Sequence, residues 1–162
     1  MPKKSVRIGL RLVPEDSLLV ARIAQWAHCT PEQVFAAAIQ FFAHLLESRA
    51  LDCRELVIRH MTLRQQFTLV LPRIHSRKFE PMDDTEPDST HQFFLPANAA
   101  AHTDRLIGKG FAANRQSLIR VALASYHLIL EKERDGWEIF WKTPGKKLRR
   151  PQSVGRAACY LL

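Results

Sequence analysis

One pattern of elements occurs twice in this chain, once in each half. The alignment that matches Thr30 with Asn114 also matches Val34 with Leu118 without a gap. Each copy predicts a short strand, a helix, a tight turn and a longer helix. A strand and two helices are too few to bury wide apolar faces alone. The repeat therefore predicts that the two copies pack against each other.

The first copy begins with a strand over residues 4–12, in which apolar and polar residues alternate. Its inward face carries Val6, Ile8, Leu10 and Leu12. Its outward face carries Ser5, Arg7, Gly9 and Arg11. Arginine can pair bidentately with guanine in a DNA major groove, and glycine lets the backbone come close. The outward face thus predicts a DNA-reading surface, and a solvated edge strand is the alternative interpretation.

Two helices follow this strand. Pro14 with Glu15 and Asp16 predicts a helix start, because proline suits the first turn and acids suit the positive end of the helix dipole. Thr-Pro-Glu-Gln at residues 30–33 is a capping box that starts the second helix. The inner side of the second helix is apolar over a wide arc: Val34, Phe35, Ala38, Phe41, Phe42, Leu45 and Leu46.

The second copy predicts a strand over residues 90–96, a helix over 98–109 and a helix over 115–134 capped by Asn114. The inner face of the last helix consists of Leu118, Ile119, Ala122, Leu123, Tyr126, Ile129 and Leu130. In the strand, the outward residues are predicted to be Thr90, Gln92 and Phe94. An outward phenylalanine is unusual there, so either Phe94 packs against the linker or the tail, or a slip of one residue turns His91 and Phe93 outward instead; both alternatives stay open.

The two strands differ in what they would read. Glutamine can pair with adenine, and Phe94 can contact a thymine methyl group, whereas Arg7 and Arg11 favour guanine. We therefore expect an asymmetric or imperfectly palindromic DNA site that is guanine-rich under the first strand.

Residues 110–123, which run from Gly-Phe through Asn-Arg-Gln-Ser-Leu-Ile-Arg-Val-Ala-Leu, resemble the turn and second helix of the ribbon-helix-helix family. This family of bacterial and phage DNA-binding proteins includes the Arc and MetJ repressors. Its members normally pair two chains, each of which gives one strand to a ribbon. The present chain is similar to the single-chain members among accessory proteins of plasmid conjugation and T-DNA transfer. The resemblance covers residues 4–48 and 89–134.

The resemblance implies a mainly α fold with a two-stranded antiparallel β-ribbon, in which two ribbon-helix-helix repeats of one chain form a pseudo-dimer. It implies that bases are read by Ser5, Arg7, Gly9, Arg11, Thr90, Gln92 and Phe94. Phosphates would be bound by helix N-termini and nearby cations. This second set consists of Lys3, Lys4, Thr30, Asn114, Arg115, Lys146, Lys147, Arg149 and Arg150. For Arg115, a solvated surface charge is the alternative.

The chain divides into repeat 1 (residues 1–50), a connecting segment (51–88), repeat 2 (89–135) and a C-terminal tail (136–162). The connecting segment holds two strand patterns, at residues 56–59 and 66–71. The second of these is either a decoy or one of two added strands that cover a sheet edge. Residues 80–88 are acidic and rich in proline, which predicts a solvated linker.

The tail contains six basic residues and one acidic residue. A basic arm on the DNA backbone and a disordered solubilising tail are both open interpretations. Its aromatic cluster, Trp137, Phe140 and Trp141, is expected to cap the core.

Charge and composition narrow the function classes. Lys and Arg number 24 against 16 Asp and Glu, and this net charge of +8 favours a polyanionic partner. No apolar run approaches the roughly 20 residues that cross a bilayer, and the Met-Pro-Lys-Lys start lacks the apolar core of a signal peptide. A cytoplasmic location and no membrane partner are expected. Cys29, Cys53 and Cys159 are widely spaced, so we expect neither a disulfide nor a zinc site.

The seven histidines form no metal-ligand or catalytic motif, so we expect no enzymatic activity, no metal and no cofactor. The predicted function is sequence-specific binding of double-stranded DNA, by a transcriptional repressor or by a DNA-transfer (relaxosome) accessory factor. Other DNA-processing or transfer proteins are expected as further partners, and the chain would act as a monomeric pseudo-dimer or as a higher assembly on DNA. The alternative is a protein-interaction adaptor or antitoxin-like module without specific DNA readout.

Overall fold

The computed structural model describes residues 5–11, 14–52, 55–60, 62–68, 90–110, 112, 114–142 and 152–153. The helices among them are α1 (Pro14–Ala27), α2 (Pro31–Asp52), α3 (Ala97–Gly108) and α4 (Arg115–Arg134). The strands among them are β1 (Ser5–Arg11), β2 (Glu55–His60), β3 (Gln65–Thr68), β4 (Thr90–Pro96), β5 (Trp137–Lys142) and β6 (Gln152–Ser153). The prediction of a mainly helical fold with antiparallel strands is confirmed.

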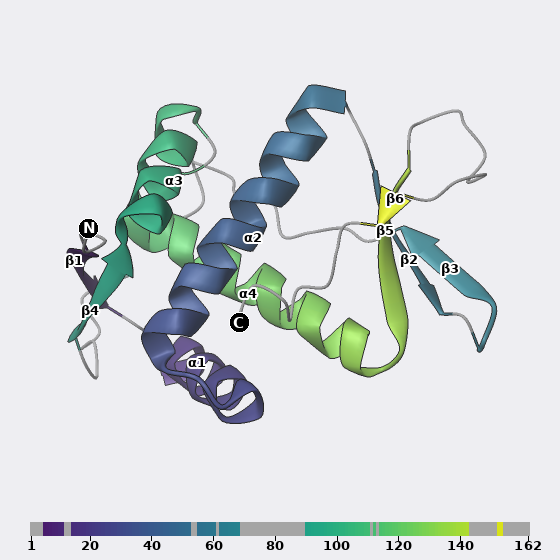
Figure 1. The fold of residues 1–162 in the computed structure, drawn as a ribbon, viewed down its shortest axis with the longest axis horizontal. Coiled ribbons are helices and arrows are strands. Elements are labelled where there is room, and N and C mark those ends of the chain that lie inside the picture. The colour runs from purple at the N-terminus through teal and green to yellow at the C-terminus, as the bar shows by residue number, and fades with distance from the viewer. Residues whose placement is uncertain are drawn as a thin grey trace.

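The strands form two antiparallel sheets at opposite ends of a helical layer (Figure 1). β1 pairs with β4 at one end. At the other end the strand order is β3-β2-β5-β6. β4 leads directly into α3, and α4 leads through a tight turn into β5, so the helical layer joins the two sheets.

The long helices α2 and α4 contact each other and form the centre of the core. The ring of Phe41 lies 5.6 Å from the ring of Tyr126, centroid to centroid, at a tilt of 58°. The inner faces predicted from the sequence are confirmed, because their residues on α2 and α4 are buried apart from Leu46, which is half-buried. Burial of such side chains contributes about 1.5–3 kcal/mol each, which explains why two long helices dominate the fold.

The short helices cross over to the other repeat. α1 packs on α2 and also on α4, and α3 packs on α4 and also on α2. The burial patterns of α1 and α3 coincide when the buried Asp16, Val20 and Ile23 are matched with the buried Ala99, Thr103 and Leu106. We call this match the short-helix alignment.

The long-helix alignment matches α2 with α4 and Thr30 with Asn114. Its offset between the two repeats is one position larger than that of the short-helix alignment. Repeat 2 therefore has one extra residue, which lies in the turn between α3 and α4. The turns between the helices therefore differ in length, while each short helix contacts both long helices.

The four-stranded sheet combines the connecting segment with the tail. Leu56 and Ile58 of β2 lie with Ile139 and Trp141 of β5 in the hydrophobic core. Of the two interpretations of residues 66–71, added strands are observed: β3 pairs with β2 over Gln65–Thr68. The predicted capping of the core by the tail aromatics is confirmed by Trp141, which is buried. Residues 80–88 lie outside the described residues.

His60 fixes the corner where α4 turns into β5. Its Nδ1 accepts from the backbone N–H of Leu63 (3.1 Å), so the proton is on Nε2, which donates to the carbonyl of Asp135 (2.9 Å). Gly136 has φ +89°, and a Cβ placed there would lie 3.0 Å from Nε2 of His60. The turn therefore requires glycine for its backbone angle and for the close approach of the imidazole.

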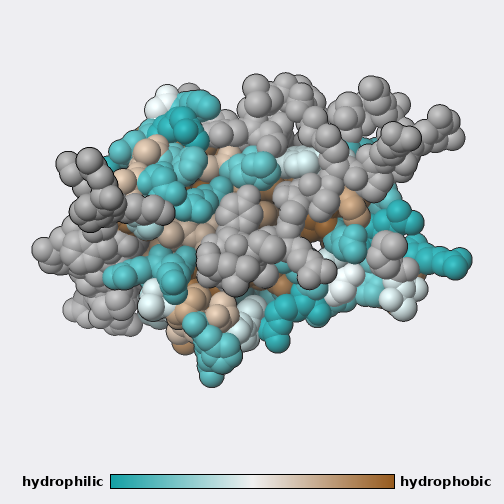
Figure 2. Space-filling model, viewed as in Figure 1, coloured by the Kyte–Doolittle hydropathy of each residue, from teal (hydrophilic) through white to brown (hydrophobic). Residues whose placement is uncertain are grey.

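The surface of the described part of the chain is mostly hydrophilic in the view of Figure 2, where the strongest hydrophobic colour lies in recesses. The large apolar side chains that are exposed among the described residues are Leu18, Leu63 and Phe67. In that part of the chain, every helix is too short or too polar to cross a membrane.

Candidate nucleic-acid interface

The pairing of β1 with β4 determines which residues share a face. Val6 pairs with Leu95, which is completely buried, so that face is directed toward the core. The opposite face contains positions 7, 9 and 11 of β1 and their partners 94, 92 and 90 of β4. Positions 91 and 93 share the face of Leu95, so the one-residue slip is not the observed phase. The side chains of residues 5–11 and 90–94 lie outside the described part of the structure.

The outer face is arranged symmetrically around one residue pair. Gly9 pairs with Gln92, and the short-helix alignment, extended back to the strands, matches the same two residues. It also matches Arg7 with Thr90 and Arg11 with Phe94. Each strand therefore contributes three equivalent positions, which carry Arg, Gly and Arg in one strand and Thr, Gln and Phe in the other. Ser5 lies at the end of the pairing, opposite Pro96.

The two long helices begin at the predicted caps. The hydroxyl of Thr30 accepts from the N–H of Gln33 (3.3 Å), and Oε1 of Gln33 accepts from the N–H of Thr30 (2.9 Å). Oδ1 of Asn114 accepts from the N–H of Ser117 (2.9 Å). The capping box and the asparagine cap are both confirmed.

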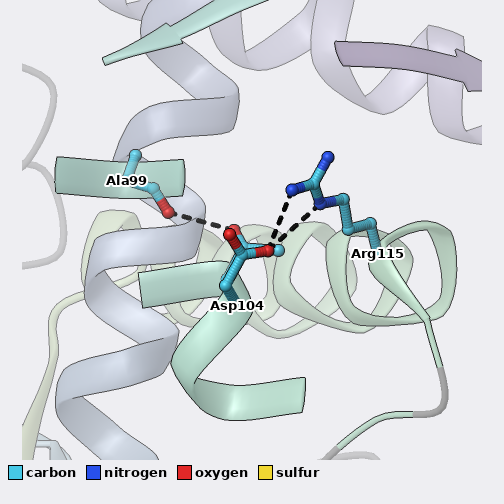
Figure 3. Close-up of polar contacts among 4 residues, drawn as sticks. Ala99, Asp104 and Arg115 are labelled. Carbon is cyan, nitrogen blue, oxygen red and sulfur yellow. Dashed lines mark hydrogen bonds and ion pairs between the residues drawn. The ribbon is translucent and has the colours of Figure 1, made fainter. Parts of the chain in front are cut away.

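Arg115 is joined to the helix that precedes it (Figure 3). Its Nε and Nη2 donate to Oδ1 of Asp104 on α3, at 3.2 and 2.9 Å. The side chains of Arg115 and Asp104 are 44% and 58% exposed, so the pair is open to solvent and to a ligand. Arg115 is therefore held at the start of α4 by an ion pair that contributes little to stability.

The surroundings of the two helix starts differ in charge. Arg105, Lys109 and Arg115 are exposed around the turn between α3 and α4, where Asp104 offsets one of their three charges, and the first turn of α4 has no acidic residue. The first turn of α2 instead carries Glu32. An anion would be attracted more strongly to the start of α4 than to the start of α2.

A largely buried ion pair that the sequence did not indicate connects α1 with α4. Nε of Arg120 on α4 donates to Oδ2 of Asp16 on α1 (2.9 Å), and the side chains of Asp16 and Arg120 are 11% and 29% exposed. Burial raises the pKa of Asp16, although Arg120 acts in the opposite direction. The pair connects the helix that follows β1 to the long helix of the other repeat. The one sequence signal for an inward Asp16 is its helical spacing from Val20 and Ile23, which places the three residues on one face of α1.

Six of the predicted phosphate-binding residues lie outside the described residues: Lys3, Lys4, Lys146, Lys147, Arg149 and Arg150. Among the residues that are described, no group of three or more His, Cys, Asp or Glu side chains could hold a metal ion.

Comparison of the chain with protein-family models, with curated proteins and with solved structures found no match. The interpretation of the interface therefore depends on its own geometry: a paired sheet face opposite the face of the buried Leu95, and two capped helix starts of different charge.

Proposed function

We propose that this protein binds double-stranded DNA sequence-specifically, with the β1–β4 sheet as a ribbon in the major groove and the two repeats as a pseudo-dimer within one chain. The observation that carries this proposal is the register of β1 with β4. It gives one sheet face three positions from each strand, which carry Arg, Gly and Arg in β1 and Thr, Gln and Phe in β4.

The groove chemistry follows from those residues. A two-stranded ribbon fits a major groove about 12 Å wide. Arg7 and Arg11 would each pair with O6 and N7 of a guanine, and the central Gly9 would allow the backbone to approach the base edges. Gln92 would read an adenine from the other strand. The two halves of the DNA site would differ because these residues differ.

The helix starts would hold the DNA backbone on either side of the ribbon. The basic surroundings of Arg115 favour a stronger phosphate contact at the start of α4 than at the start of α2. A repressor and a DNA-transfer accessory factor would both use this geometry, because each marks one defined site on a duplex.

A protein-interaction module is the second candidate function. It is favoured by the exposed apolar side chains of Leu63 (58%) and Phe67 (54%) on and beside β3, an edge strand far from the β1–β4 sheet (Figure 1). This surface would suit an adaptor that contacts other proteins.

The test begins with the selection of bound fragments from sheared DNA of the source organism. The affinity of the protein for the fragment that is selected most strongly is then measured at several salt concentrations. Arg7→Ala and Arg11→Ala are each expected to cost about 1–3 kcal/mol on that site. Arg59→Ala and Arg64→Ala remove the same charge from exposed positions in or near the opposite sheet and serve as matched controls. They should change affinity much less.

Equal binding of all fragments, with the same affinity for wild type and for Arg7→Ala and Arg11→Ala, would contradict groove readout. The positive charge would then act only through non-specific attraction to phosphates, and the adaptor function would become the better explanation.

A further inference from the structure

The two crossed contacts between the repeats are built from unlike residues. In the contact of α1 with α4, Asp16 and Arg120 form the buried ion pair. The short-helix alignment matches Asp16 with Ala99, and the long-helix alignment matches Arg120 with Ala36. Both alanines are buried, on α3 and α2, which contact each other. One contact has an ion pair at the positions where the other has two buried alanines.

The outer part of the same contact differs in the same way. The indole of Trp26 on α1 stacks on the imidazole of His127 on α4, with 5.9 Å between ring centroids and 17° between planes. The guanidinium of Arg134 lies 3.9 Å from the centre of the indole. The positions that correspond to Trp26 and His127 in the contact of α3 with α2 are Lys109, which is exposed, and the buried Ala43.

The central crossing of α2 and α4 is also complementary in size. The long-helix alignment matches Phe41 and Phe42 with Ser125 and Tyr126, and all four are buried. Phe41 contacts Tyr126 across the crossing. Oγ of Ser125 has no hydrogen-bond partner among the described residues, so the serine serves as a small residue that leaves room. Two phenylalanines on one helix are thus matched by a small and a large residue on the other.

We propose that these residues are a pairing code, which makes each repeat of the chain pack only against the unlike repeat. Pairing of first repeats from two chains would bury the Asp16 carboxylate against Ala36 without its cation, and an unpaired buried charge is strongly destabilising. It would also crowd four phenylalanine rings into one crossing. Pairing of second repeats would place Arg120 against Ala99 and would put Ser125 in the place of Phe41 beside Tyr126, which leaves a cavity.

This code has a consequence for the DNA site, which rests on the proposed function. Every ribbon combines β1 with β4, so the protein reads a composite of two unlike half-sites and never a palindrome of either one.

Charge exchange in the full chain tests the code. Asp16→Arg alone and Arg120→Asp alone each put like charges into the buried contact, so each variant should unfold at a lower temperature than wild type. The double variant, Asp16→Arg with Arg120→Asp in one chain, should recover a single chain of about 18.6 kDa and most of the lost thermal stability.

The decisive experiment mixes the two single variants, unfolds them together and refolds them. Repeat 1 of each chain then finds its opposite charge only in repeat 2 of the other chain. Native mass spectrometry should detect a species of twice the single-chain mass that contains one copy of each variant. This readout uses no DNA, so it is independent of whether the proposed function is correct.

Asp104→Arg and Arg115→Asp form the matched control, because this Asp–Arg pair has the same 2.9 Å contact but lies within one repeat. Exchange between chains cannot reunite these charges, so their mixture should contain no mixed species. The pairing code is overturned if the mixture of the Asp16 and Arg120 variants also contains none, or if both mixtures contain it equally.

Discussion

His28 occupies a backbone conformation that suits glycine. Its φ is +51°, and it follows α1 in a Schellman-type turn in which the N–H of Cys29 donates to the carbonyl of Ala24 (3.1 Å). After α3 the left-handed position is filled by Gly110, at φ +80°. The same kind of helix end therefore uses a strained residue in repeat 1 and an unstrained one in repeat 2.

His28→Gly is expected to raise the free energy of unfolding by about 1 kcal/mol, because a side chain in the left-handed region costs about 1–2 kcal/mol. Urea unfolding monitored by circular dichroism measures this change. Gly110→Ala, the converse exchange, should lower stability by a similar amount. A loss of stability in His28→Gly would mean that the imidazole makes a contact that outweighs the strain.

The contact of Asp16 with Arg120 could not be predicted from the sequence. The sequence predicts that Asp16 suits the positive end of the helix dipole. In the structure, its carboxylate is also buried and accepts a hydrogen bond from Arg120. A carboxylate in a first helical turn is normally solvated, and its partner lies 104 residues away in the chain. No local pattern connects the two.

At the level of elements, the capping motifs and the apolar spacing in the sequence are sufficient to predict where α3 and α4 begin and end. The caps at Thr30 and Asn114 bond to residues three positions further on, within the range that a sequence motif covers. The bounds of α4 agree with the prediction, and α3 begins and ends one residue earlier than predicted. Short-range hydrogen bonds and apolar periodicity determine these features.

Asn114→Ala should lower the free energy of unfolding by about 1 kcal/mol, because the N–H of Ser117 loses its acceptor. Thermal unfolding measures the effect. Asn114→Asp keeps an acceptor at the same position and should stay close to wild type. Equal losses of stability in both variants would show that the side-chain NH2 group of Asn114, rather than its side-chain oxygen, stabilises the turn.

Long-range pairing was much harder to predict. The sequence shows the strand patterns in the connecting segment and in the tail, but it does not show that they pair in one sheet, because Ile58 pairs with Ile139 across half of the chain. The register of β1 with β4 and the short-helix alignment likewise depend on the folded chain. The outer-face positions of β1 could be predicted because strict alternation allows only one choice, whereas in β4 the one-residue slip stayed open.

At the scale of the whole molecule, the contact of α1 with α4 makes stability depend on pH. Burial lowers the pKa of His127, and Arg22 acts in the same direction, while Glu131 opposes them. The unfolded chain then binds a proton more readily than the folded chain at pH values between the lowered pKa and about 6.5, the ordinary value. Stability therefore decreases as the pH falls through that window.

His127→Gln should flatten this dependence, so its melting temperature should fall less than that of wild type between pH 7 and pH 5. His28→Gln removes an exposed imidazole and is the control. Parallel pH profiles for wild type and His127→Gln would contradict the assignment. Asp16 acts with the opposite sign at lower pH, because its raised pKa makes the folded chain the better proton acceptor there.

The crossed packing of the repeats also determines when the chain can fold during its synthesis. β1 pairs with β4, and α1 packs on α4 as well as on α2, so both complete their contacts only after a ribosome has produced the rest of repeat 1 and the whole connecting segment. At about 5–20 residues per second this is a delay of roughly 4–17 s. During that time the apolar faces of α1 and α2 have no cover from repeat 2. The nascent first half therefore keeps apolar surface in contact with water until the second half emerges.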